Sequence, residues 1–359
     1  MDKIKIGISA GDINGIGLEV TLKTLTNENI LKYCTPIIYA STKVVSYHKN
    51  IAGVEFPFQV IKDMTSRPSN EKVNIINCWQ DNVSITLGKA SEEGGKFAYI
   101  ALEKAVHDLR DGHLDALVTA PINKEAMKMA SFPYPGHTEY LAQQLGGKDL
   151  MLMLYEDLRI GVATNHVPVS EVSAMLTKEV VEQKLHTMDH CLKMDFGIER
   201  PTIAVLGLNP HASDNGVIGD EEEKIIRPVI IEAKKKGMLV VGPFPADGFF
   251  GSGEYKKYDG ILAMYHDQGL VPFKLLSFGK GVNFTAGLNA VRTSPDHGTA
   301  FDIAGSNLAD PSSFRKALFA AIDIARSRKE YYEFRENALV SKTSKLQDQE
   351  DEVLEEGKE

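Results

Sequence analysis

Three histidines are placed where they could bind a metal ion together. Each follows an apolar run of strand length: His166 comes after RIGVATN, His211 after TIAVLGLNP and His266 after GILAMY. Ligands of open parallel sheets bind beyond the carboxyl ends of the strands, so we expect the three imidazoles at one edge of a sheet. Imidazoles that converge on one point make a divalent-metal site with positions open for a substrate. The alternative for each histidine is a hydrogen-bonded loop residue.

Asp267 stands beside the third of these histidines. Its carboxylate could bind the metal directly or accept a hydrogen bond that fixes a ring. Alternatively, it caps the following turn.

A second group of polar residues favours an anionic ligand. Lys274, Asn283 and Arg292 lie in PFK, GVNFTAGL and AVRTSPDHG, and His137 and Thr138 lie in PGHTEYLA. Arginine binds carboxylate or phosphate through two N–H groups, and lysine supplies a compact charge. Together they predict a small anionic substrate beside the metal. The alternative for each cation is a solvated surface charge.

The N-terminal stretch KIKIGISAGDINGIGLEV has a strand, a glycine loop and a helix-like run in the order typical of nucleotide-binding loops. Gly11, Gly15 and Gly17 form G-x-x-x-G-x-G, which is neither the dinucleotide fingerprint nor the lysine-containing phosphate loop. In TAPINKEAM, Lys124 either reaches a phosphate from a helix start or is a solvated first-turn residue. No G-x-S-x-G motif supports a serine hydrolase.

The elements that must position these residues alternate between strands and helices. Strand-length apolar runs are KIKIGIS, TPIIYA, VNIINC, DALVTA, RIGVATN, TIAVLGL, GMLVVGP and GILAMY. A helix is expected over residues 92–110, where Ala98, Leu102, Ala105 and Leu109 share one apolar face. This alternation predicts an α/β fold with largely parallel sheets.

The length of 359 residues favours roughly two domains. The loop SFPYPGHTEY carries two prolines and a glycine, so we place a crossing near residue 130. The predicted division is residues 1–130 with about 305–340 in one α/β/α domain and 131–304 in another. The acidic segment 343–359 is expected to be a disordered tail.

The composition limits the partners. A net charge of −9 and a pI of about 5.7 argue against a nucleic-acid surface. No apolar run is long enough to cross a membrane, and the N-terminus lacks an apolar signal core. Cys34, Cys78 and Cys191 are scattered, which favours reduced core thiols in a cytoplasmic protein.

Several long segments together resemble one enzyme family. They are ISAGDINGIGLEV, TAPINKEAM, GHTEYLA, ATNHVPVSEV, GLNPHASDNGVIGDEE, GPFPADGFF, YDGILAMYHDQGLVPFK and VNFTAGLNAVRTSPDHGTAFDIAG. In this order they are similar to the 4-hydroxythreonine-4-phosphate dehydrogenases of pyridoxal phosphate biosynthesis, from Lys3 to about Tyr332. The family departs from this chain at Ile13 and Leu18, where it often has prolines, and at Ser213 and Asp214.

The resemblance implies a fold like that of isocitrate and isopropylmalate dehydrogenases, and NAD as cofactor, with NADP as the alternative. The loop from Gly11 to Glu19, including Asp12, Gly15 and Gly17, would lie near the reacting end of the cofactor. The segment from Asp296 to Gly305, including His297 and Gly298, would help form the adenosine pocket.

The resemblance also implies roles for the polar residues. His166, His211 and His266 would bind zinc, magnesium or cobalt, with the third histidine supplied by the partner chain of a homodimer. His137, Thr138, Lys274, Asn283 and Arg292 would contact a small phosphorylated amino acid. The 3-oxo acid formed by its oxidation would then lose carbon dioxide.

Three alternatives stay open. The proton acceptor could be a bound water, Asp247 or Lys274. The substrate could instead be a phosphorylated four-carbon sugar acid or a cyclic diol carboxylate, used by a paralogue of the same fold. The chain could also be a non-catalytic metal- or nucleotide-binding protein.

Overall fold

The computed structural model describes residues 3–336 of the chain. The predicted acidic tail at 343–359 lies outside the described residues. In the described part, twelve strands form one sheet in the order β3-β4-β2-β1-β5-β12-β11-β6-β7-β10-β8-β9. The strands are β1 (Ile4–Ser9), β2 (Cys34–Ala40), β3 (Phe58–Ile61), β4 (Val73–Asn77), β5 (Ala116–Thr119), β6 (Gly147–Tyr155), β7 (Leu158–Thr164), β8 (Thr202–Leu206), β9 (Leu239–Phe244), β10 (Gly260–Tyr265), β11 (Val282–Leu288) and β12 (Val291–Pro295).

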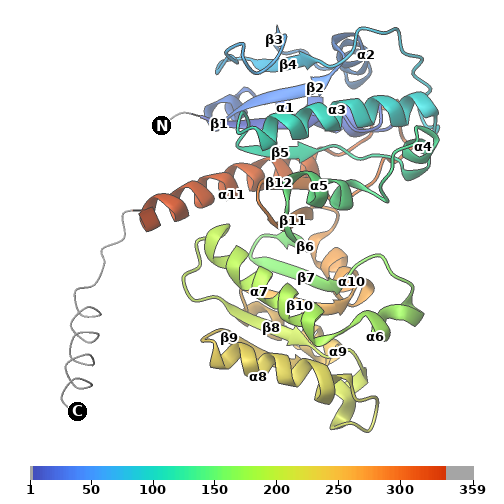
Figure 1. The fold of residues 1–359 in the computed structure, drawn as a ribbon. Coiled ribbons are helices and arrows are strands. Elements are labelled where there is room, and N and C mark those ends of the chain that lie inside the picture. The colour runs from blue at the N-terminus through green and yellow to red at the C-terminus, as the bar shows by residue number, and fades with distance from the viewer. Residues whose placement is uncertain (1–2, 337–359) are drawn as a thin grey trace, which may run out of the picture.

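The sheet runs along the long axis of the molecule, from β3 at one end to β9 at the other (Figure 1). Most neighbours are parallel, but β11 pairs antiparallel with β12 and β6, and β6 pairs antiparallel with β7. The predicted α/β fold with a largely parallel sheet is therefore confirmed. Because one sheet continues through both halves, the division near residues 130 and 305 remains a prediction.

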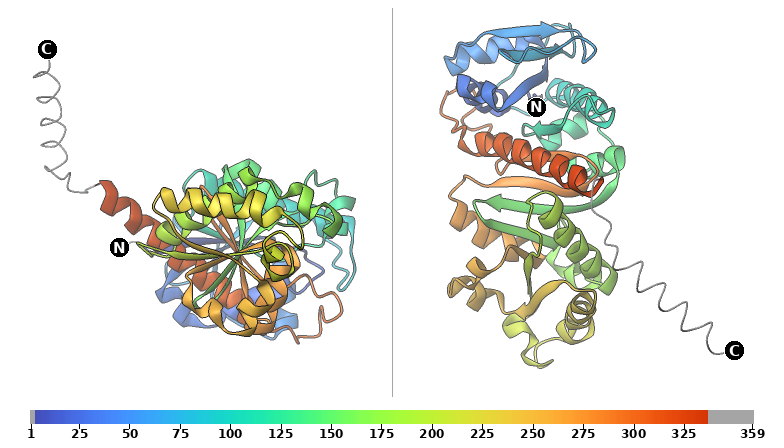
Figure 2. Two further views of the ribbon diagram at one scale, coloured as in Figure 1. Left: turned by 90° about the horizontal axis from the view of Figure 1, so that it is seen from below. Right: turned by 90° about the vertical axis from the view of Figure 1, so that its left-hand side faces the viewer.

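Helices cover both faces of the sheet, as the edge-on view in Figure 2 shows. They are α1 (Gly17–Leu25), α2 (Thr42–Ala52), α3 (Glu92–Arg110), α4 (Lys124–Met129), α5 (His137–Leu145), α6 (Val172–Met175), α7 (Lys178–Met194), α8 (Arg227–Lys235), α9 (Ala246–Gly251), α10 (His266–Ser277) and α11 (Ser312–Glu336). Helix α3 packs on β1, β2 and β5, and α7 packs on β6, β7, β10 and β11.

Helix α3 spans the predicted residues 92–110. Ser91 begins it as N-cap, because its hydroxyl accepts a hydrogen bond from the Gly94 amide at 3.0 Å. The four residues of the predicted apolar face are all buried. The helical period of that face was therefore a correct guide to the packing.

Helix α11 crosses the middle of the molecule beside β12 and also contacts β1, β5 and α1 (Figure 1). Near its end, Arg328 donates from Nε to Asp195, which follows α7, at 2.5 Å. Both side chains are buried, so this pair connects α11 to the half of the sheet that carries β6 to β10. The three cysteines are buried and free, as predicted. None of the helices in residues 3–336 has the length and apolar content that a membrane span requires.

Candidate active site

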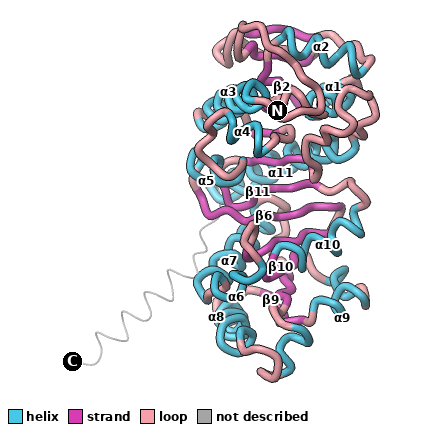
Figure 3. Tube along the Cα trace, turned by 90° about the vertical axis from the view of Figure 1, so that its right-hand side faces the viewer, coloured by secondary structure: helices cyan, strands magenta, loops and turns pink. Residues whose placement is uncertain are grey.

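The three histidines leave the same edge of the sheet, as predicted. Strand β10 lies between β7 and β8 and is parallel to both. His166 follows β7, His266 begins α10 directly after β10, and His211 follows β8. In Figure 3 the strands of this half lie side by side in the sheet, with α10 beside β10. The topology therefore brings the three loops to neighbouring positions.

Two of the three rings approach each other. The ring centroids of His166 and His266 are 5.6 Å apart. Asp267 Oδ1 lies 2.7 Å from His266 Nδ1 and accepts its hydrogen, which leaves His266 Nε2 free to bind a metal. No group of three or more His, Cys, Asp or Glu side chains in residues 3–336 is arranged to hold a metal ion. The three-histidine metal site therefore remains a prediction.

His211 lies in an unusual turn. Residues 211–215 all have positive φ, between 45° and 70°, although none is glycine. Left-handed backbone costs an L-residue roughly 1–2 kcal/mol, so neighbouring groups must hold the turn. Asn209 is one of them: its amide donates to Glu221 at 2.7 Å and to the buried Glu222 at 2.9 Å. Such strain is concentrated at functional sites.

Gln268 connects the ends of β10 and β8. Its side chain accepts a hydrogen bond from the Met264 amide at 2.7 Å and donates to the Gly207 carbonyl at 2.6 Å. This bridge fixes the start of α10, which carries His266, against the loop that leads to His211. No local pattern in the sequence indicates this bridge.

A cavity of roughly 360 Å³ opens beside His166. Its lining comes from β5, β11, β12 and the starts of α4 and α5. The lining residues are Thr119, Ala120, Pro121, Ile122, Lys124, Pro135, Gly136, His137, Thr138, Glu139, His166, Asn283, Arg292, Ser294, Pro295, His297 and Gly298. Four of the five predicted substrate contacts are thus brought together, and Lys274 is the exception.

Arg292 is the most deeply buried charge of the cavity, with 3% of its surface exposed. Within residues 3–336, no carboxylate oxygen forms a hydrogen bond or ion pair with it. Its Nε and Nη2 donate to Thr119 Oγ1 at 3.0 and 2.6 Å, and its Nη1 donates to Thr285 Oγ1 at 3.0 Å. Burial lowers the pKa of Arg292 to about 10, and the negative charge of Glu139 partly opposes this shift. A buried cation without a counterion is costly unless an anion binds it.

His137 is the remaining partner of Arg292. Its Nδ1 lies 3.3 Å from Arg292 Nη2, whereas its Nε2 is buried without a hydrogen-bond partner. Burial and the charge of Arg292 hold the pKa of His137 well below its usual range. His137 is therefore a neutral ring at physiological pH.

The two predicted catalytic residues lie outside the cavity lining. Lys274 is largely exposed, and its Nζ is 3.4 Å from Asp296 Oδ1. Asp247 is exposed in the first turn of α9, a helix that contacts the turn of His211. Their catalytic roles remain predictions.

The predicted cofactor residues fall into two groups. Gly11, Asp12, Gly15 and Gly17 are buried. A Cβ atom at Gly15 would lie 2.9 Å from the Thr299 carbonyl, and one at Gly11 would overlap the Pro121 carbonyl. These glycines permit close approach of the chain to itself, so their role toward a cofactor remains a prediction.

The second group lies at the end of β12. His297 and Gly298 line the cavity, and His297 donates from Nδ1 to the Gly298 carbonyl at 3.0 Å. Burial raises the pKa of the Asp296 carboxyl, although Lys274 opposes this. Asp296 thus connects the predicted cofactor segment to the predicted catalytic lysine.

Sequence reasoning missed three contributors to the site. Thr119 and Thr285 hold Arg292, but a threonine within a strand gives no distinguishing signal. Glu139 is the sole carboxylate among the lining residues, and it follows directly after His137 and Thr138 in GHTEYLA. Lys124, considered as a phosphate contact or a solvated residue, lines the cavity and lowers the pKa of His166 together with burial.

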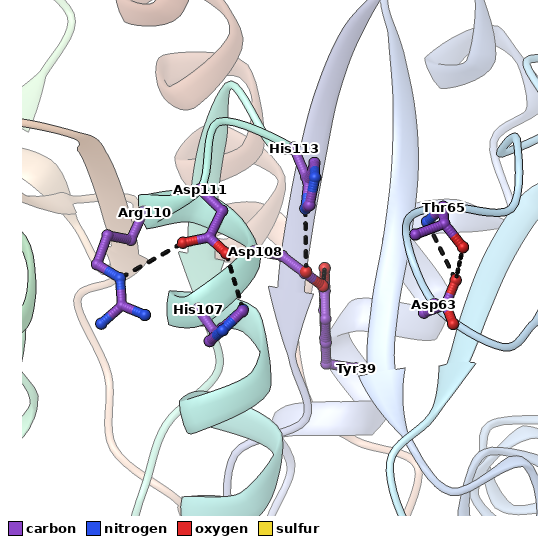
Figure 4. A network of polar contacts seen from close by, with 8 residues as sticks. All are labelled: Tyr39, Asp63, Thr65, His107, Asp108, Arg110, Asp111 and His113. Atoms are coloured by element: carbon purple, nitrogen blue, oxygen red, sulfur yellow. Dashed lines mark hydrogen bonds and ion pairs between the residues drawn. The ribbon is translucent and has the colours of Figure 1, made fainter.

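A larger cavity of roughly 550 Å³ lies beside the second half of α3. Several charged residues in and beside it have protein partners, as the network in Figure 4 shows. Tyr39 donates to Asp108 at 2.6 Å, Arg110 lies 3.5 Å from Asp111, and Lys104 donates to the Cys78 carbonyl at 2.8 Å. Among the lysines and arginines that line these two cavities, Arg292 is the buried one, so its cavity is the better candidate for an anion site.

Comparison with known proteins gives consistent results. The family model described as "Pyridoxal phosphate biosynthetic protein PdxA" matches residues 32–321. A 4-hydroxythreonine-4-phosphate dehydrogenase from Bacteroides thetaiotaomicron is 48% identical and covers 94% of this chain and 96% of its own length. A protein from Oceanobacillus iheyensis, named "Putative D-threonate 4-phosphate dehydrogenase", is 37% identical and covers 90% of this chain and 98% of its own length.

A solved structure is similar over nearly the same length. The crystal structure of 4-hydroxythreonine-4-phosphate dehydrogenase from Klebsiella pneumoniae has a TM-score of 0.79 and 34% identity. The match covers 90% of this chain and 98% of that chain.

Proposed function

The chain belongs to the PdxA family of pyridoxal phosphate biosynthetic proteins, and we propose that it is an NAD-dependent 4-hydroxythreonine-4-phosphate dehydrogenase. The reaction oxidises the secondary alcohol of 4-hydroxythreonine 4-phosphate to a 3-oxo acid, which decarboxylates to 3-amino-2-oxopropyl phosphate. The observation that carries the proposal is Arg292, a buried cation without a carboxylate partner in the wall of a cavity. A phosphorylated amino acid would supply the missing anion.

The residues of the cavity suit this substrate. Arg292 supplies a buried positive charge, and the exposed Lys124 supplies a second one. His137, Thr138, Asn283 and Ser294 offer hydrogen-bonding groups around an anion. Arg292 is buried, and the lower local dielectric strengthens its attraction to an anionic group.

The donor set at the strand ends fits a divalent metal. His166 and His266 have rings 5.6 Å apart, and Asp267 orients His266 so that Nε2 is free. His211, on the neighbouring strand end, would complete a set of imidazoles suited to zinc or cobalt, with magnesium as a harder alternative. A bound ion would supply positive charge that lowers the pKa of the substrate alcohol.

A dehydrogenase of this kind needs a nicotinamide cofactor, which accepts the hydride when bound. We assign NAD in preference to NADP. His297 and Gly298, which line the cavity, and the nearby Asp296 are the residues of this chain that we place toward it. The protein's contribution is to hold the reacting carbon of the substrate next to the nicotinamide ring.

We propose that the chain forms a homodimer and works in the cytoplasm. Three apolar side chains of α10 and its C-cap are exposed: Val271 (55%), Leu275 (69%) and Phe278 (82%). Their spacing of four and three residues puts them on one side of the helix. Because α10 begins with His266, a partner chain seated there would lie close to the metal ligands. The three buried free thiols are consistent with a reducing compartment.

Substrate oxidation is tested by the absorbance of NADH. The protein is mixed with NAD, a divalent metal and each member of a panel: 4-hydroxythreonine 4-phosphate, its dephosphorylated form, D-threonate 4-phosphate and a cyclic diol carboxylate. We expect turnover with the first compound only. A preference for D-threonate 4-phosphate would favour a paralogue that acts on a sugar acid. The relative with 37% identity carries the name of such an enzyme. No turnover with any compound would favour a non-catalytic role.

Chain mixing tests whether the sites are shared. His166→Ala and His266→Ala chains, each inactive, are refolded together. Recovered activity means that His266 serves the partner's site. An inactive mixed dimer means that His166 and His266 of one and the same chain act together in a site, as their approach within one chain allows.

A further inference from the structure

The guanidinium of Arg292 is almost saturated by protein acceptors. An arginine has five N–H groups. Four of them are used: two on Thr119 Oγ1, one on Thr285 Oγ1 and one on His137 Nδ1. One hydrogen of Nη1 is left over, so a bidentate arginine clamp on the ligand, expected from the residue type, is not available in this arrangement. The hydrogen bonds of Arg292 therefore mainly hold neighbouring protein side chains in place.

The hydrogen bond to His137 determines which ring nitrogen carries the proton. A guanidinium can only donate, so His137 Nδ1 must be the acceptor and must be unprotonated. In the neutral ring the single proton is then on Nε2. That nitrogen is buried, has no partner and belongs to a residue that lines the cavity. A buried N–H without an acceptor costs free energy, and a ligand oxygen would remove this cost.

We propose that Thr119, Thr285 and Arg292 form a positioning relay: the two threonines hold the guanidinium, and the guanidinium fixes His137 as the tautomer that donates from Nε2 to an oxygen of the anionic ligand. Thr119 and Thr285 are then positioning residues of the site. The identity of the anion rests on the proposed function, whereas the tautomer does not.

The groups that face His137 favour a neutral donor. Arg292, on β12, contacts the ring and disfavours an imidazolium, and Lys124, at the start of α4, is a second positive charge that lines the same cavity. Glu139, on the same helix as His137, has the opposite charge and favours an imidazolium. His166 and His297 also line the cavity, from the loops after β7 and β12. Burial and the adjacent guanidinium dominate, so the Nε2–H donor should persist between pH 6 and 8.

The tautomer can be measured without substrate. The full-length protein is labelled with ¹⁵N-histidine, and the His137 signals are identified by their loss in His137→Gln. We expect the pattern of a neutral ring protonated on Nε2, unchanged between pH 6 and 8. A ring protonated on Nδ1, or an imidazolium at pH 7, would overturn the proposal whatever the enzyme's activity.

Variants of Thr119 test the relay. Thr119→Val keeps the side-chain shape but removes the acceptor of two Arg292 N–H groups, so the His137 signals should change and the KM for the phosphorylated substrate should rise about tenfold. Thr119→Ser should restore both properties. The matched control is Thr293→Val, a buried threonine of the neighbouring strand β12 whose hydroxyl donates to the Ala317 carbonyl at 2.8 Å and has no hydrogen bond with Arg292.

The outcomes separate the relay from the enzyme's identity. If Thr119→Val folds and its His137 signals match those of the unaltered protein, the relay is wrong. Should Thr119→Val not fold, Thr285→Val provides the same test on Nη1. If the tautomer is found as expected but 4-hydroxythreonine 4-phosphate is not oxidised, the relay stands and the proposed function fails.

Discussion

Arg292 shows why residue type alone does not define a role. Lysine at this position keeps the charge, but one ammonium group cannot hold Thr119, Thr285 and His137 in their present places. We predict that Arg292→Lys lowers kcat/KM for the phosphorylated substrate at least about tenfold, since a lost charge-assisted hydrogen bond costs about 1.5–3 kcal/mol and about 1.4 kcal/mol corresponds to tenfold. Steady-state kinetics with varied substrate and varied NAD would measure it.

The control is Arg326→Lys, at an exposed arginine of α11, which should leave the kinetics unchanged. Equal losses toward NAD and substrate in Arg292→Lys would move this residue to the cofactor side.

Asp12 provides a prediction about pH. Burial raises its pKa from 3.8 to about 6, against the hydrogen bond from the Asn14 amide, and its Oδ2 has no partner. The folded state thus binds this proton more tightly than the unfolded state. The stability that Asp12 contributes is complete below pH 3.8 and is lost as pH rises through about 6. The two pKa values correspond to at most roughly 3 kcal/mol.

We therefore expect Asp12→Asn, in which the amide oxygen can still accept from Asn14, to flatten the dependence of unfolding free energy on pH between 4 and 7. Urea unfolding at several pH values measures this. The exposed Asp81→Asn serves as the control. An Asp12→Asn curve parallel to that of the unaltered protein would mean that Asp12 is charged in the folded state at pH 5.

The positions of the site residues could be predicted from the sequence, but the hydrogen bonds between them could not. His166, His211 and His266 were predicted at one sheet edge because each follows a strand, and the topology confirms that placement. The hydrogen bonds that hold Arg292 are accepted by Thr119 and Thr285, on strands β5 and β11. Such contacts depend on the pairing of distant strands, which local patterns do not report.

At the scale of elements, the glycines of α3 have a packing role. A Cβ at Gly95 would overlap the Ala126 carbonyl of α4, and α4 begins with Lys124 at the cavity rim. Gly95→Ala must push the two helices apart. We predict a loss of about 1–3 kcal/mol in unfolding free energy, as for other overpacked sites, measurable by urea unfolding.

The matched control is Gly248→Ala in helix α9, where no atom lies within 4 Å of the added Cβ. Alanine favours the helix there, so this variant should be as stable as the unaltered protein or slightly more stable. A Gly95→Ala protein of undiminished stability would show that α4 can shift at no cost.

Elements with a regular apolar pattern were predictable, and those that build the cavity were not. Eight apolar runs became β1, β2, β4, β5 and β7 to β10, and α3 has the predicted bounds. Strand β12 was missed because its residues, VRTSP, include an arginine, a threonine, a serine and a proline. They are buried in the middle of the sheet because they face a polar site or pair with other strands. The polar sequence of β12 predicts an exposed segment, whereas the fold buries it.

At the scale of the whole molecule, the central strands β11 and β12 explain why a two-domain division is hard to place. Strand β12 pairs with β5 on one side and with β11 on the other, and β11 pairs with β6. The strands that join the two halves also carry Asn283 and Arg292. Any change in the angle between the halves would therefore change the positions of Asn283 and Arg292 in the anion site.

Assembly gives the last prediction. The exposed stripe of Val271, Leu275 and Phe278 on α10 is the surface that we assign to the homodimer. A charge placed there would face an apolar partner surface and would lose its hydration in the interface. We predict that the double variant Leu275→Asp and Phe278→Asp is a folded monomer, seen by light scattering after size exclusion, with unchanged circular dichroism.

Its activity should fall sharply if the partner completes the site, because α10 also begins with His266. The control is Leu308→Asp, at a leucine that is 72% exposed in the loop before α11, which should remain dimeric and active. A double variant that is still a dimer would assign the interface to another surface. A monomer with full activity would instead separate assembly from catalysis and require that His166, His211 and His266 of one chain act together.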